Sequence, residues 1–211
     1  MIELDIFSDT VCPWCYIGNK RLKKAINDHK NIEFKQTWRP FQLNPGMPPD
    51  GMDRQEYLIS KFGSADAAKT IYDNIYDEGL LEGINFNFDS IQTTPNSFNS
   101  HRLLALAYKQ GIQENVLDSL FESYFLNGED IGDPNILLDI AIKHQIDAED
   151  FKTYLSDQEN IEPLANEEIE ARKMGINSVP TFIVNKQIVI NGAQTSENFD
   201  IIFKKLTNNI N

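Results

Sequence analysis

Residues 2–8 begin the chain with an alternation of apolar and polar side chains. Three apolar side chains fall on one face and two carboxylates on the other, so the segment is predicted to be a strand with at least one buried face. A helical pattern follows, with apolar side chains at Ile17, Leu22 and Ala25. A second strand is predicted from about residue 32 to 43, before a turn rich in proline. The chain therefore opens with a strand–helix–strand unit.

Between residues 53 and 174 the apolar side chains recur at spacings of three and four, which is typical of amphipathic helices. The clearest stripe lies in 113–126. Thr94, Asp133 and Asp147 are candidate N-cap residues for three of these helices. Helices are predicted for the following ranges: 53–62, 64–81, 96–110, 113–126, 134–145, 147–155 and 159–174.

Strand patterns return after this helical block. Residues 179–184 and 187–190 are apolar runs separated by Asn185-Lys186, which predicts two strands joined by a tight hairpin. Ser196 begins a final helix. Strands thus stand at both ends of the chain, and the roughly 110 residues between them are enough to carry a core of their own. The predicted fold class is α/β with a helical insertion.

The composition is that of an ordinary globular chain. Hydrophobic residues make up 41% of the 211 positions and charged residues 24%, which argues against disorder and collagen-like repeats. A net charge of −13 is that of a solvated acidic surface, and it repels phosphate backbones and anionic membranes. Neither nucleic acid nor a membrane is therefore an expected partner. The N-terminus has no basic leader and no apolar run reaches about 18 residues, so the expected location is the cytoplasm.

Cys12 and Cys15 are the two cysteines of the sequence. Two cysteines cannot form a disulfide framework, and the three scattered histidines do not complete a closed zinc site, so no metal is expected. At positions i and i+3 near the start of a helix, both thiols face one end of it, and Pro13 favours a helix start there. Unpaired N–H groups and the helix dipole stabilise a thiolate at that end. The pattern favours dithiol–disulfide exchange over inert buried thiols or half of a metal site.

Pro180 stands near the start of the first strand after the helical block. Two interpretations stay open for it. It is a device that protects a sheet edge, or it is a cis-proline beside which the backbone of Val179 binds an extended substrate.

Five segments together resemble the DsbA-like thioredoxin family and, within it, the FrnE-type cytoplasmic oxidoreductases. These segments are FSDTVCPWC at 7–15, WRPFQLNP at 38–45, NSHRL at 99–103, GINSVPTF at 175–182 and NGAQ at 191–194. The resemblance implies a thioredoxin-like domain formed by residues 1–48 and 175–211, with a large helical domain inserted at 49–174. It also implies that Cys12 attacks, that Cys15 resolves, and that cis-Pro180 lies opposite them with Val179 at the substrate edge.

Three further residues belong to the expected substrate-binding set. Pro13 and Trp14 lie between the cysteines, where periplasmic oxidants of the family have Pro-His, so the strongly oxidising potential of those proteins is not carried over. His101 matches a histidine of the family that faces the cleft. A buried or surface histidine without a role in binding is the alternative.

The predicted function is that of a thiol–disulfide oxidoreductase without a cofactor. Its expected partners are protein or small-molecule thiols and disulfides, glutathione among them. Two alternatives stay open: a glutathione-dependent isomerase or transferase of the 2-hydroxychromene-2-carboxylate isomerase or kappa class, which usually has serine at the position of Cys12, and a non-catalytic binding or holdase module. The direction of electron flow, the physiological substrate and the choice between monomer and homodimer are not determined.

Overall fold

The computed structural model describes residues 1–208, and its centre is a four-stranded sheet. The strands are β1 (Ile2–Ser8), β2 (Phe34–Pro40), β5 (Thr181–Val184) and β6 (Ile188–Asn191), in the spatial order β2–β1–β5–β6. β1 and β2 are parallel, and β5 is antiparallel to both of its neighbours. The sheet therefore combines segments from the two ends of the chain.

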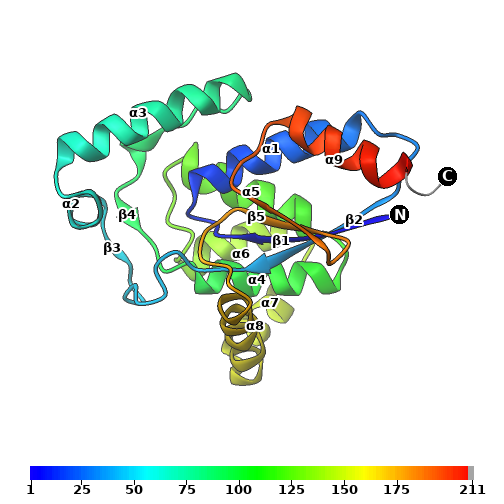
Figure 1. Cartoon of the computed structure of the whole chain (residues 1–211). Helices are drawn as coiled ribbons and strands as arrows, with labels where there is room; N and C mark the ends of the chain where they lie inside the picture. The colour runs from blue at the N-terminus through cyan, green and yellow to red at the C-terminus, as the bar shows by residue number, and fades with distance from the viewer. Residues whose placement is uncertain (209–211) are drawn as a thin grey trace.

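Helices cover the sheet from both sides (Figure 1). α1 (Pro13–Asn27) and α9 (Ser196–Asn208) lie side by side above it. α4 (Phe98–Lys109) and α8 (Ile161–Lys173) lie below it and pack against β2. α5 (Gln113–Phe125) lies beside α1, where Asn19 donates a 2.9 Å hydrogen bond to Asp118. The buried strands thus have helix on both faces.

A long helical arm extends from the sheet in Figure 1. It consists of α2 (Arg54–Phe62), α3 (Ala65–Leu81) and the short strand pair β3 (Met52–Asp53) with β4 (Thr93–Thr94). Arg21 of α1 joins α3 to the sheet region, because its guanidinium pairs with Glu78 at 2.5 Å and with Glu82 at 2.7 Å. Two ion pairs therefore link the arm directly to α1.

One hydrophobic core connects the sheet and the helical block. Tyr16 of α1 stacks on Phe121 of α5 with ring centroids 4.9 Å apart, and its ring meets the edge of Phe86 at 5.9 Å. Both rings belong to a buried cluster that also contains residues of β1, β5 and α9. The proposed division into 1–48 with 175–211 and 49–174 stays a prediction, and its last residues, 209–211, lie outside the described part of the chain.

Most of the predicted elements agree with the structure. The strand at 2–8, the hairpin at 185–186 and the helix from Ser196 are confirmed. Asn185 and Lys186 both have positive φ, at 49° and 56°, as a tight hairpin between twisted strands requires. Asp133 and Asp147 cap α6 (Pro134–Lys143) and α7 (Ala148–Ser156) through their side chains. A 3-10 turn at Phe88–Ser90 was not predicted, and another at Gln158–Asn160 overlaps the start of the helix predicted for 159–174.

One predicted strand boundary and one predicted helix cap were wrong. The second strand covers Phe34–Pro40 rather than 32–43. Its partner β1 ends at Ser8, opposite Pro40, and the next N–H groups, of Gln42 and Leu43, donate to the side chains of Glu168 and Asp9. Thr94 does not cap a helix, because it pairs with Met52 in the two-stranded sheet, and α4 begins after Ser97.

Candidate active site

Cys12 and Cys15 lie together where α1 begins. β1 ends at Ser8, three residues of loop follow, and Cys12 is the extended N-cap residue of the helix, with Pro13 at the first helical position. The Cys12 carbonyl accepts hydrogen bonds from the N–H groups of Cys15 at 3.0 Å and Tyr16 at 3.3 Å. Cys12 is 4% exposed and Cys15 is fully buried, both as free thiols. The predicted pair is thus held at one helix end.

The two sulfur atoms have different surroundings. Burial raises the pKa of the Cys15 thiol well above its ordinary value, and the neighbouring Cys12 raises it further. The Ser8 hydroxyl and the Asp9 backbone act in the opposite direction but do not reverse the shift. Cys15 is therefore a protonated thiol at neutral pH. Cys12 lies at the N-terminal end of the helix, where backbone N–H groups have no partner within the helix.

The loop before β5 forms the opposite wall of the site. The Val179–Pro180 peptide bond is cis, and the Cys12 thiol lies 3.9 Å from the Val179 carbonyl oxygen as a weak donor to it. Pro180 is buried against α1 at Gly18, where a side chain would lie only 3.1 Å from the proline ring. Val179 is half-buried. Glycine at position 18 thus lets the Pro180 loop approach the helix that carries the cysteines.

A family comparison agrees with this geometry. The model of the DsbA-like thioredoxin domain matches residues 3–203. The chain belongs to the DsbA-like thioredoxin family. The predicted fold, a thioredoxin-like fold with mixed helices and strands, is therefore confirmed.

This DsbA-like chain is similar to several known proteins. A probable DsbA oxidoreductase of Streptomyces coelicolor is 28% identical, with a TM-score of 0.87, and the match covers 97% of this chain and 89% of that one. The uncharacterized protein YwbO of Bacillus subtilis is 26% identical over 94% of both chains. The cytosolic disulfide reductase DsbM of Pseudomonas aeruginosa, solved with GSH, has a TM-score of 0.69 at 15% identity, covering 98% of this chain and 99% of that one. That last likeness shows the fold alone.

The loop that leads into the DsbA-like dithiol is fixed by buried polar contacts. The Asp9 carboxylate accepts from the N–H of Leu43 at 2.7 Å, and the Asp9 carbonyl accepts from the N–H of Cys12 at 3.1 Å. The Thr10 hydroxyl is 2.6 Å from that of Ser100 on α4. Asp9 and Thr10 are fully buried. The helical block therefore helps to position Cys12, and sequence analysis missed both residues although they directly precede the cysteine motif.

His101 lies behind this loop. It is 3% exposed, and its Nε2 atom is 3.5 Å from the Asp9 carboxylate without forming a hydrogen bond to any described residue. It also lines a cavity of about 380 Å³ between β2, α4 and α8. The structure thus brings His101 to Asp9, and no hydrogen bond joins its Nε2 atom to either sulfur; its predicted part in substrate binding stays a prediction.

The other predicted site residues, Pro13 and Trp14, directly follow Cys12 at the start of α1. Pro13 is buried, and Trp14 is half-buried and packs against the core.

Within residues 1–208, no three His, Cys, Asp or Glu side chains come together as a possible metal site. The same part of the chain contains no helix that is long and apolar enough to cross a membrane.

Proposed function

We propose that this chain is a thiol–disulfide oxidoreductase that exchanges disulfides through Cys12 and Cys15, in the cytoplasm. The observation that supports it best is the position of Cys12 at the N-terminus of α1, beside the Val179 carbonyl at 3.9 Å. An extended substrate that reaches Cys12 can therefore also meet the backbone at Val179. The fully buried Cys15 stands one helical turn away, ready to displace whatever Cys12 has bound.

The exchange takes place in two steps, each of which forms one disulfide bond and breaks another. The Cys12 thiolate attacks one sulfur of a substrate disulfide, so a mixed disulfide forms and the departing sulfur takes a proton from water. Cys15 then loses its proton and attacks the Cys12 sulfur, which releases the second substrate thiol and leaves a Cys12–Cys15 disulfide. The reverse sequence oxidises a substrate dithiol. Because the pKa of Cys15 is raised, Cys15 is a poor first nucleophile and is suited to the second step.

The burial of the cysteines restricts the substrate. With Cys12 only 4% exposed, we expect a slender group, such as a small disulfide or an extended peptide segment, to reach its sulfur more readily than a flat protein surface. We therefore propose glutathione disulfide and flexible cystine-containing peptides as the substrate class, and DsbM, solved with GSH, offers a precedent on the same fold.

The test is to trap the mixed disulfide. Cys15→Ser, incubated with glutathione disulfide or a one-disulfide peptide, should accumulate an adduct at Cys12 that intact-protein mass spectrometry detects and dithiothreitol releases. The matched control is Cys12→Ser, which should form no adduct because Cys15 has no exposed surface. Equal labelling of the two variants would contradict the assignment of roles. An adduct with glutathione but with no peptide would instead favour the glutathione-dependent isomerase or transferase.

A further inference from the structure

A cavity of about 620 Å³ lies in the helical arm, between α2, α3 and residues 86–92. Neither cysteine lines it, nor do Val179 and Pro180. Its volume is that of a site for a small molecule, since such sites commonly enclose about 300–1,000 Å³. The cavity is therefore separate from the dithiol site and needs its own explanation.

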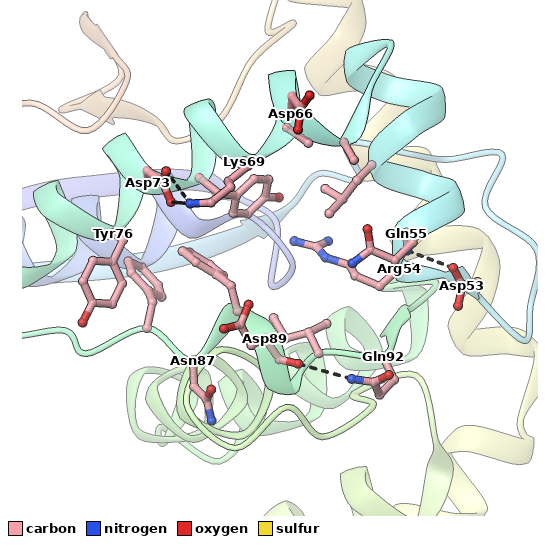
Figure 2. A pocket seen from close by; sticks show the side chains of 17 residues that line it. Asp53, Arg54, Gln55, Asp66, Lys69, Asp73, Tyr76, Asn87, Asp89 and Gln92 are labelled. Carbon is pink, nitrogen blue, oxygen red and sulfur yellow. Dashed lines mark hydrogen bonds and ion pairs between the residues drawn. The ribbon is translucent and has the colours of Figure 1, made fainter.

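Arg54 is the unusual residue of this cavity. Its guanidinium points into the centre of the space in Figure 2, although the residue is only 5% exposed. No carboxylate of residues 1–208 lies within 4 Å of it, in contrast to Arg21, which pairs with two. An arginine is always charged, and a buried charge without a counter-ion is costly. The structure thus keeps a positive charge in this cavity without neutralising it.

Every partner that the structure gives to Arg54 is neutral. One guanidinium nitrogen donates to Thr94 at 3.1 Å and to the Tyr124 hydroxyl at 3.4 Å, and the group lies 4.9 Å from the centroid of the Tyr72 ring. Burial raises the pKa of Tyr124 and of Tyr72. These phenols therefore keep their protons near neutral pH and cannot balance the charge.

The remaining walls indicate the kind of molecule that fits. Tyr72, Tyr76, Phe86 and Phe88 give the cavity aromatic sides, and the rings of Phe86 and Phe88 stack at 4.7 Å. Flat apolar groups pack well on such rings.

The charges at the edge limit the charge of that molecule. Four aspartates and Lys69 join Arg54 in the lining. Lys69 is occupied by an ion pair with Asp73 at 2.7 Å, and Asp53 accepts two N–H groups of its own helix, with its carboxylate turned away from the guanidinium in Figure 2. A single negative charge neutralises Arg54, whereas a dianion would also meet the surrounding aspartates.

We propose that this cavity binds a small aromatic monocarboxylate, whose carboxylate pairs with Arg54 and whose rings pack against the aromatic wall that Tyr72 forms together with Phe86 and Phe88. This site is independent of the thiol–disulfide function proposed above.

The test uses 2-naphthoate as the probe and measures its dissociation constant by calorimetry on the full chain. The neutral analogue 2-naphthamide should bind at least about tenfold more weakly, which is the usual loss when a charge-assisted hydrogen bond is removed. The dianion 2-naphthyl phosphate should also bind more weakly than the carboxylate. Failure of 2-naphthoate to bind at millimolar concentration, or equal affinity for the acid and the amide, would overturn the proposal.

Variants locate the bound probe. Arg54→Gln should abolish the preference for the acid over the amide. Because Arg54 is buried and its loss can unfold the arm, Ala65→Trp provides a second variant: residue 65 is exposed and lines the cavity, so the indole should fill it and weaken binding about tenfold or more. Thr70→Trp, exposed on the same helix outside the lining, is the matched control and should bind as the wild type does. Equal affinities of the two tryptophan variants, or loss of binding in Cys12→Ser, would place the probe elsewhere and refute the proposal.

Discussion

Replacing Gly18 by alanine should destabilise the protein, although alanine is the better helix former. Gly18 lies inside α1, where the exchange by itself should add about 1 kcal/mol of helix stability. The new methyl group would lie 3.1 Å from Pro180 Cγ and 3.3 Å from Phe182 Cζ. Phe182 is fully buried, with its ring edge-on to Phe199 at 4.9 Å, so it has little room to move. Overpacking of this kind costs about 1–3 kcal/mol, and the net expected loss is about 1 kcal/mol.

Urea denaturation of the reduced protein measures this loss as a lower midpoint with an unchanged slope. Gly18→Val should lose more, about 3 kcal/mol, because it adds further methyl groups at the same contact. The control is Gly46→Ala, where a new side chain meets nothing within 4 Å and a gain of about 0.4–1 kcal/mol is expected. If Gly18→Ala stabilises the protein as much as Gly46→Ala does, then Pro180 does not pack on α1 as described and the reasoning is refuted.

Two more substitutions test the buried groups around the dithiol. Burial, then Glu122 and Asp118, raise the pKa of Tyr16 to about 12, so the folded state keeps a proton that the unfolded state releases above pH 10. The stability that depends on this proton is complete below pH 10 and is lost towards pH 12. The unfolding free energy of the wild type should therefore fall by about 2–3 kcal/mol relative to Tyr16→Phe over that range; parallel pH profiles would contradict it. Asp9→Asn should lower stability by about 1–3 kcal/mol at pH 7, because the amide places a donor where the buried carboxylate accepts from Leu43 and Val11. Asp53→Asn, at an exposed helix cap where asparagine also serves, should change stability by less than about 0.5 kcal/mol, and equal losses in the two variants would show that the Asp9 contacts are unimportant.

Local patterns were sufficient for much of this fold. The strand at 2–8 and the helix that contains Cys12 and Cys15 at its start follow from alternation, helical spacing and Pro13, all of which depend on near neighbours in the sequence. The caps at Asp133 and Asp147 follow from the same short-range chemistry. These features need no knowledge of the rest of the molecule.

The predictions that were wrong, and the features that were not predicted, depend on contacts between residues that are far apart in the sequence. The strand at 34–40 ends where its partner β1 ends, at the pair Ser8 and Pro40, and Leu43 donates instead to Asp9, 34 positions away. Threonine is a residue type that often caps helices, but Thr94 instead pairs with Met52 in the two-stranded sheet. The charge left without a counter-ion at Arg54 is visible only once the described side chains surround it, because the sequence contains many carboxylates that could have paired with it.

Long-range contacts also connect the two cysteines to the helices between β2 and β5. A helix N-terminus with two cysteines is a local feature, yet the loop that delivers Cys12 to it is held by Ser100 through Thr10. Arg21, two turns after Cys15, is neutralised by Glu78 and Glu82 of the arm and also donates to the Ala193 carbonyl near Pro180. The helices between β2 and β5 therefore do more than cover the sheet. They supply a hydrogen-bond partner for the loop before Cys12 and counter-ions for Arg21 on the helix that contains both cysteines, so the position of this helix depends on contacts from distant parts of the chain.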